Sequence, residues 1–244
     1  MGSYSRSKQN HSFNFLETLE IRNCDSLCVL SLDLFPKLVR LELEDCRNFE
    51  SLSVSSEPYS ERQQYLITSL IKLQVWECLK FESFSLLVEG GSSLNLNAPN
   101  LKDLGFYHLE NLKSLPEDMH ILLPSLRHLW LYDCPQLESF PIGGLPSNLV
   151  HLSIEMCPKL VGESFLEERL LPTNLECLYL HGYQNLKTIN YKGLLHLQSL
   201  RRVTIDNCLS FSFKCLPEES LPRSISELQI GTTVQCFCSV ARGK

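Results

Sequence analysis

The sequence lacks the short motifs that many enzymes and membrane proteins require. It contains no glycine-rich phosphate-binding loop, no dinucleotide-binding glycine pattern, no His-Glu-x-x-His zinc motif and no Gly-x-Ser-x-Gly nucleophile elbow. No apolar run reaches the roughly 18 residues of a membrane-spanning helix. Basic residues are few, with 22 Lys and Arg against 28 Asp and Glu, and they form no stripe along the chain. We therefore expect no catalysis, no cofactor, no membrane span and no nucleic-acid partner.

Patterns for metal binding and disulfide scaffolding are also weak. The eleven cysteines are odd in number, and the closest pair, Cys236-x-Cys238, has neither a second pair nor a His beside it. Of the seven histidines, His128, His151 and His181 fall near one predicted face, but none has a partner at ligand spacing within its own element. We expect no bound metal.

What the chain does contain is a recurring apolar pattern, Leu-x-x-Leu-x-Leu. Its starts are Leu16, Leu38, Leu70, Leu101, Leu126, Leu149, Leu175, Leu200 and, for a partial copy, Ile225. Successive starts are 22, 32, 31, 25, 23, 26, 25 and 25 residues apart, and six of these eight intervals fall within the leucine-rich-repeat range. The two long intervals require insertions, which we predict to be surface loops at residues 51–64 and 84–100.

The spacing predicts an α/β-type repeat solenoid. In each copy Leu-x-Leu directs two apolar side chains to one face of a short strand, and only stacking on neighbouring copies can bury that face. We expect a leucine-rich-repeat horseshoe with a parallel concave sheet of eight or nine strands. Its convex side should be irregular and loop-rich, with one helical turn near residues 162–170. The solenoid should occupy residues 14–231, between a disordered segment (1–13) and a C-terminal tail (232–244).

Cysteine follows the repeat period. Three residues after Leu-x-Leu, six copies carry Cys: Cys24, Cys46, Cys78, Cys134, Cys157 and Cys208. In a leucine-rich repeat this position points inward, and a buried thiol there acts as a small apolar group with a weak hydrogen-bond donor. We expect these thiols to be reduced and to donate to backbone carbonyls.

The variable residues around Leu-x-Leu should form the exposed, concave face of the sheet. In the middle repeats these positions carry large aromatic side chains, including both tryptophans of the chain. Clustered exposed aromatics are typical interface anchors, although aromatics on adjacent strands also cover one another for purely structural reasons. The predicted protein-binding residues are Trp76, Tyr107, Trp130, Tyr132, Tyr179 and His181.

Several phrases of the sequence resemble one family. They are LVRLELEDC (38–46), LKSLP (112–116), LRHLWLYDCPQL (126–137), LPSNL (145–149) and LSIEMCPKL (152–160). Over residues 14–231 the chain resembles the leucine-rich-repeat region of plant disease-resistance proteins of the nucleotide-binding, leucine-rich-repeat type, coiled-coil class. The resemblance implies a cytoplasmic immune receptor in which this region binds pathogen effectors or host proteins and regulates a nucleotide-binding switch domain. That domain is absent from these residues.

Two other functions are compatible with the repeats. Substrate-recognition subunits of ubiquitin ligases also place Cys at the inward position, but the residues before the first repeat are too few for an F-box. Receptor or inhibitor ectodomains use a regular repeat with Gly-x-Ile-Pro, which this sequence lacks.

Overall fold

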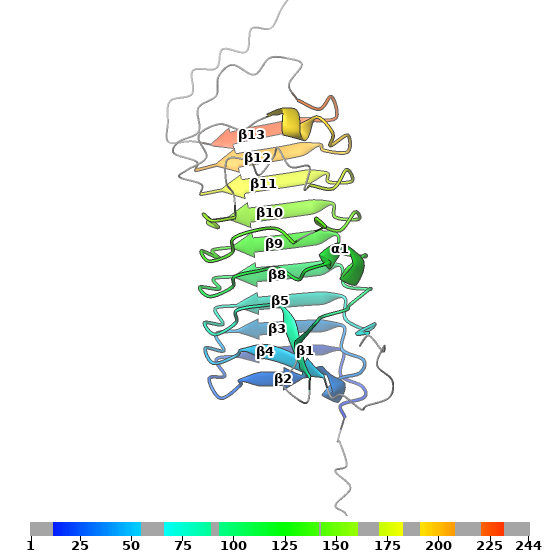
Figure 1. Ribbon diagram of the computed structural model, residues 1–244, viewed down its shortest axis with the longest axis vertical. Coiled ribbons are helices and arrows are strands. Elements are labelled where there is room, and N and C mark those ends of the chain that lie inside the picture. Colours follow the sequence, from blue (N-terminus) through cyan, green and yellow to red (C-terminus); the bar gives the residue numbers. More distant parts are fainter. Residues whose placement is uncertain are drawn as a thin grey trace, which may run out of the picture.

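The computed structural model describes residues 12–54, 66–88, 93–141, 143–160, 171–182, 191–207 and 221–231. Each repeat contributes one short strand to a parallel sheet, and the strands stack along the long axis of the molecule (Figure 1). In spatial order they are β1 (Thr18–Arg22), β3 (Arg40–Glu44), β5 (Lys72–Trp76), β8 (Asp103–Tyr107), β9 (His128–Tyr132), β10 (His151–Glu155), β11 (Cys177–His181), β12 (Arg202–Asp206) and β13 (Glu227–Gly231). The predicted parallel sheet and its strand number are confirmed for the described residues.

The leucines of the repeat form a continuous core behind this sheet. Inner strands alternate buried and half-buried residues, as in β9 and β10, because successive side chains point to opposite faces. Leu41, Leu73 and Leu129 are fully buried, with an exposed fraction of 0%. The apolar residue that follows the turn adds a second column of contacts: Phe49 stacks on Phe81 with ring centroids 5.7 Å apart. Each coil is therefore stabilised by its neighbours and not by itself.

A left-handed turn ends nearly every strand of the sheet. The residue after each of seven strands has a positive φ of 48–53° without being glycine: Asn23, Asp45, Glu77, His108, Asp133, Met156 and Asn207. Gly182 does the same after β11, with φ 78°. In each case the amide of this residue donates to the last carbonyl of the next strand, for example from Glu77 to Tyr107 at 2.9 Å. The turn thus extends the ladder of hydrogen bonds by one step.

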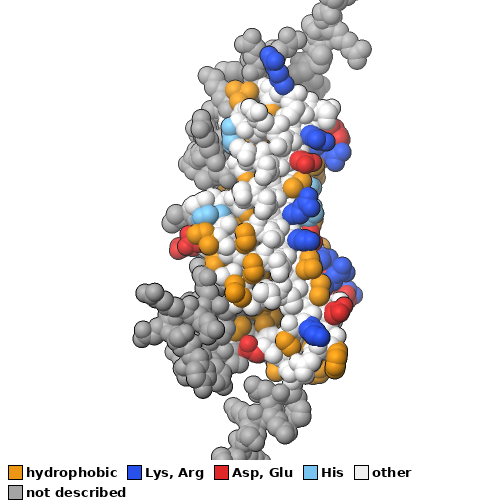
Figure 2. All heavy atoms as spheres, turned by 90° about the vertical axis from the view of Figure 1, so that its right-hand side faces the viewer, with side chains coloured by type: hydrophobic (Ala, Val, Ile, Leu, Met, Phe, Trp, Pro, Cys, Tyr) orange, Lys and Arg blue, Asp and Glu red, His pale blue; other side chains and the backbone are white. Residues whose placement is uncertain are grey.

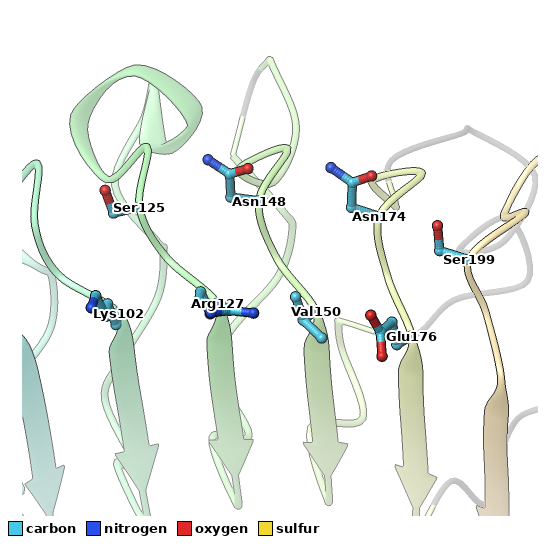
Figure 3. A pocket seen from close by; sticks show the side chains of 8 residues that line it. All are labelled: Lys102, Ser125, Arg127, Asn148, Val150, Asn174, Glu176 and Ser199. Atoms are coloured by element: carbon cyan, nitrogen blue, oxygen red, sulfur yellow. The ribbon is translucent and has the colours of Figure 1, made fainter.

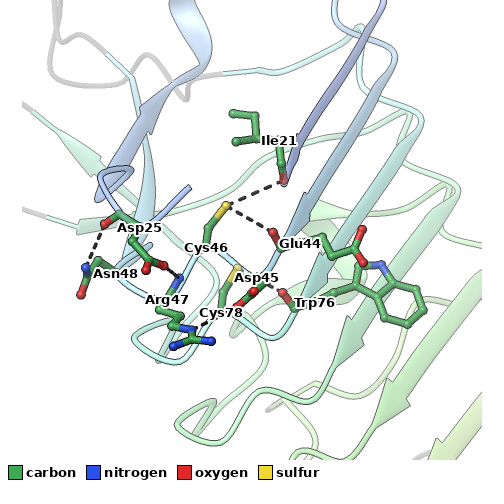
Figure 4. Close-up of polar contacts among 9 residues, drawn as sticks. All are labelled: Ile21, Asp25, Glu44, Asp45, Cys46, Arg47, Asn48, Trp76 and Cys78. Carbon is green, nitrogen blue, oxygen red and sulfur yellow. Dashed lines mark hydrogen bonds and ion pairs between the residues drawn. The ribbon is translucent and has the colours of Figure 1, made fainter. Parts of the chain in front are cut away.

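The periodic cysteines lie just inside these turns, as predicted. Cys46, Cys78, Cys134 and Cys157 are buried with free thiols, and Cys24 is partly exposed. The Cys46 thiol donates to the carbonyls of Ile21 (3.8 Å) and Glu44 (3.5 Å), so it links two coils (Figure 4). Burial raises the pKa of the Cys46 thiol, and it raises that of Cys78 to about 12. Cys208 lies outside the described residues.

The prediction of plain loops for the two insertions is wrong. A second, four-stranded sheet covers the opposite side of the first coils, with the order β2 (Val29–Ser31), β4 (Ser51–Val54), β6 (Ser85–Val88) and β7 (Ser93–Asn95). The Ser-rich stretch that suggested a loop alternates with apolar residues, and Leu52 and Val54 are buried in the core. Burial of these two side chains favours a strand over the polar composition around them. Residues 55–65 and 89–92 lie outside the described part.

Helical structure on the convex side is short, in agreement with the repeat length. The described elements are the 3₁₀ turns η1 (Leu32–Leu34) and η2 (Tyr191–Leu194) and one helical turn, α1 (Met119–Leu122). The helical turn predicted near residues 162–170 falls outside the described residues. None of the described helices is long and apolar enough to cross a membrane.

Candidate recognition surface

The outer face of the nine-stranded sheet, opposite the leucine core, carries all six residues that the sequence predicts for binding. Pairing between strands places them in two columns that run across the repeats. One column reads Trp76, Tyr107, Tyr132, Glu155 and His181 on successive strands. The other reads Gly105, Trp130, Ser153 and Tyr179. All six predicted residues are partly exposed: each packs partly against the sheet and keeps part of its side chain accessible to a partner.

Trp76 and Tyr107 form the tightest aromatic pair of this face. Their rings stack with centroids 3.5 Å apart and an interplanar angle of 5°. Tyr107 lies over Gly105, where an added Cβ would come within 2.7 Å of the phenol oxygen, and that oxygen accepts a hydrogen bond from Gln74 at 3.3 Å. Burial raises the pKa of Tyr107 to about 12. Gly105 in the second column therefore lets the Tyr107 ring of the first column lie flat on the sheet.

Trp130 and Tyr132 are bordered by three histidines, of which the sequence predicted His128 and His151, but not His108, to lie near this face. Tyr132 meets the His108 ring edge-on, with centroids 4.7 Å apart. Trp130 lies between His128 at 5.6 Å and His151 at 6.0 Å. The position of His108 on this face could not be predicted from the pattern of the strands, because His108 lies in the left-handed turn after β8.

Carboxylates hold two of these histidines in place. The Nδ1 of His128 lies 2.5 Å from Asp103 Oδ1, and the Nδ1 of His108 lies 3.0 Å from Asp133 Oδ2. Within the described part of the chain His151 has no carboxylate partner, and burial together with the charge of His128 lowers its pKa. The side of Trp130 that faces His151 is therefore neutral at ordinary pH, which suits an apolar or aromatic contact.

Tyr179 and His181 form a second group toward the C-terminal strands. The ring centroids of Tyr179 and His181 lie 6.2 Å apart. The Nδ1 of His181 is 2.6 Å from Glu155 Oε1, and the side chains of His181 and Glu155 are each about 20% exposed. Ser153 lies between Trp130 and Tyr179 in one column, and Glu155 lies between Tyr132 and His181 in the other. The six residues therefore form two groups along one strip of the face. Among the described residues no group of three or more His, Cys, Asp or Glu side chains could hold a metal ion.

The first strands and the turn after β3 carry several acidic residues, but most of this charge is paired. Lys72 contacts Glu42 at 2.8 Å, and Arg22 contacts Glu44 at 3.0 Å. The strip of aromatics is therefore flanked by neutralised ion pairs and not by a free acidic patch.

Four features define one architecture. Each repeat gives one strand to the nine-stranded sheet, and the leucines face one continuous core. The turn after the strand holds an inward thiol, and the register is unbroken across the nine strands. The chain is a leucine-rich-repeat protein. No family model matches it. A protein of Arabidopsis thaliana, named as a candidate disease resistance protein, is 32% identical over 222 residues, which cover 81% of this chain. The resemblance to plant disease-resistance proteins is thereby confirmed.

This leucine-rich-repeat protein spans only a part of that relative, about 15% of its length. Among solved structures, the circular leucine-rich-repeat protein CroV588 aligns with 88% of this chain and 43% of its own, at 16% identity and a TM-score of 0.40. The leucine-rich-repeat domain of the type III effector XopL aligns with 88% of this chain and 76% of its own, at 17% identity and a TM-score of 0.36. Likeness at this level carries no functional argument.

Proposed function

We propose that this leucine-rich-repeat protein is the recognition part of a cytoplasmic plant immune receptor. Its outer face binds a pathogen effector or a host protein, and through that contact it regulates a nucleotide-binding switch domain. The observation that carries the proposal is a strip of five aromatic side chains on one accessible face: Trp76, Tyr107, Trp130, Tyr132 and Tyr179. Apolar side chains gathered on an exposed face are unfavourable in water, and they are typical of surfaces that bind a partner.

Three further observations support this function. The relative that matches most of the chain is named for disease resistance. The buried thiols of Cys46, Cys134 and Cys157 donate to carbonyls and are unbridged, which suits a reducing compartment. The outer face also offers contact area that extends over several repeats, which suits a protein partner.

The experiment is a binding screen followed by a matched comparison. A yeast-displayed copy of the chain is screened against a panel of effector proteins and host proteins, and the best binder is titrated against variants. Trp130→Ala and Tyr132→Ala should each weaken binding by about 2 kcal/mol, roughly 30-fold. Ile121→Ala is the matched control, because Ile121 is a large apolar residue, 60% exposed, on the convex helical turn. Loss of binding in the control alone would reject the proposed face.

A further inference from the structure

A second surface lies at the edge of the sheet where the strands begin. An open groove of about 440 Å³ extends there from the coil of β8 to the coil of β12. It is lined by Lys102, Ser125, Arg127, Asn148, Val150, Asn174, Glu176 and Ser199 (Figure 3). Lys102, Arg127, Val150 and Glu176 are the residues just before β8, β9, β10 and β11, and the Asn and Ser residues lie in the preceding turns. The groove therefore repeats one set of positions at each coil.

Positive charge collects on this side of an otherwise acidic chain. Figure 2 shows Lys and Arg side chains in a line along the side at which the strands begin. Lys102 and Arg127 stand on adjacent strands, roughly 5 Å apart along the sheet, and both are exposed. Like charges on neighbouring strands repel each other, so this arrangement is unfavourable unless an anion lies between them.

The described part of the chain supplies no such anion. Neither Lys102 nor Arg127 has an ion-pair partner there, in contrast to Lys72, which is held by Glu42 at 2.8 Å. The nearest carboxylate in sequence, Asp103, is occupied by His128 at 2.5 Å. The two cations are thus free to bind a carboxylate from elsewhere.

The other groups of the groove indicate a peptide. Asn148 and Asn174 donate through Nδ2 to the carbonyls of Pro124 and Ser147, at 2.8 and 2.9 Å, which leaves each amide oxygen able to accept. Such acceptors at one per coil suit the regularly spaced amides of an extended backbone. Glu176 lies two strands beyond Arg127, roughly 10 Å away, and its negative charge disfavours a polyanion such as nucleic acid or an anionic membrane.

We propose that this groove binds an extended segment of a partner protein that carries mixed charge. An Asp or Glu of the segment lies between Lys102 and Arg127, and a Lys or Arg roughly 10 Å further along faces Glu176. The site is separate from the aromatic strip of the outer face and does not depend on the function proposed for that strip.

The test is selection of random decapeptides, displayed on phage, against the immobilised full chain. Peptides that bind should be enriched in Asp and Glu, and their affinity should fall as salt is raised. The double variant Lys102→Ser, Arg127→Ser should bind the selected peptides with an affinity lower by about tenfold or more. The matched control is Lys113→Ser combined with Lys159→Ser, which changes the net charge equally but outside the groove. Its affinity for the peptides should stay within about twofold of that of the native chain. Trp130→Ala should have no effect.

A second variant distinguishes loss of the binding site from loss of the folded structure. Lys102→Glu combined with Arg127→Glu should select basic peptides in place of acidic ones, which an unfolded protein cannot do. Selected peptides without acidic enrichment, or with equal affinity for the Ser double variant, would overturn the proposal. It would also be overturned if millimolar inorganic phosphate displaced the peptides, or if phosphatidylserine vesicles bound through Lys102, since either result assigns the cations to another ligand.

Discussion

Tyr107 stacks on Trp76 with ring centroids 3.5 Å apart, and it does so by lying across Gly105. A Cβ at position 105 would come within 2.7 Å of the Tyr107 hydroxyl and closer still to its ring. The phenol must therefore move if this glycine is replaced, and the stacked pair depends on a residue without a side chain.

The first prediction concerns Gly105→Ala. The displaced Tyr107 ring should lose its stacking on Trp76 and its hydrogen bond from Gln74, at a cost of about 1 kcal/mol in the free energy of unfolding. Urea unfolding and the fluorescence of Trp76 measure the two effects. Ser153→Gly is the control at another position of the same column. Unchanged fluorescence and stability in Gly105→Ala would show that the ring is not held as described.

The second prediction is a pH dependence that arises from the same ring. Burial raises the pKa of Tyr107 from 10.0 to about 12, so the folded state favours the protonated phenol. Its contribution to stability is fully present below pH 10 and is lost as the pH rises from 10 to about 12. Absorbance at alkaline pH should show a late step of tyrosine ionisation that is smaller in Tyr107→Phe, while Tyr179, whose pKa burial also raises, still titrates late. If Tyr107→Phe leaves the titration curve unaltered, the assignment is wrong.

The third prediction separates the buried thiols from the exposed one. Cys78 has a pKa raised to about 12 by burial and is inaccessible, whereas Cys28 is exposed. Iodoacetamide at pH 8 should label Cys28 at least about 100-fold faster than Cys78, because the thiolate is the reactive form. Peptide mass spectrometry of the native protein over time gives both rates, and also reports disulfides. Equal labelling, or a disulfide between two of the periodic cysteines, would contradict the packing described here.

The fourth prediction uses the left-handed turns. Glu77 has φ 51°, a conformation that costs a residue with a side chain about 1 kcal/mol. Glu77→Gly should therefore raise the free energy of unfolding by about 0.5–1 kcal/mol. Glu110→Gly is the control, since this exposed residue is not among those with positive φ, and it should lower stability by a similar amount. Thermal or urea unfolding compares the two, and destabilisation by Glu77→Gly would show that the turn is not strained.

Periodicity predicts those parts of this protein that depend on one coil and its neighbour. The leucine starts locate all nine strands, and the variable columns around them match the observed register residue by residue, from Trp76 beside Tyr107 to Glu155 beside His181. Inward cysteines follow from the same spacing. These features repeat, so each copy supports the inference drawn from the others.

Features that occur once were not predictable in this way. The strand at Ser51–Val54 lies in a Ser-rich insertion, and only burial of Leu52 and Val54 in the assembled core reveals it. The left-handed turns do recur, and four of their seven non-glycine residues are Asn or Asp, which adopt this conformation more readily than most residues, but Glu77, His108 and Met156 give no such signal. The position of Tyr107 over Gly105 depends on side-chain rotation, which spacing does not determine.

The central claim, that the outer face of the sheet recognises a protein, is tested most directly by a double-mutant titration. The best binder from the effector and host panel is measured against Trp130→Ala, Tyr132→Ala, their combination and the convex control Ile121→Ala. We predict that each single outer-face variant loses affinity by about 30-fold and that the control keeps near-native affinity. Native affinity in the combined outer-face variant, together with a loss in the control, would contradict it.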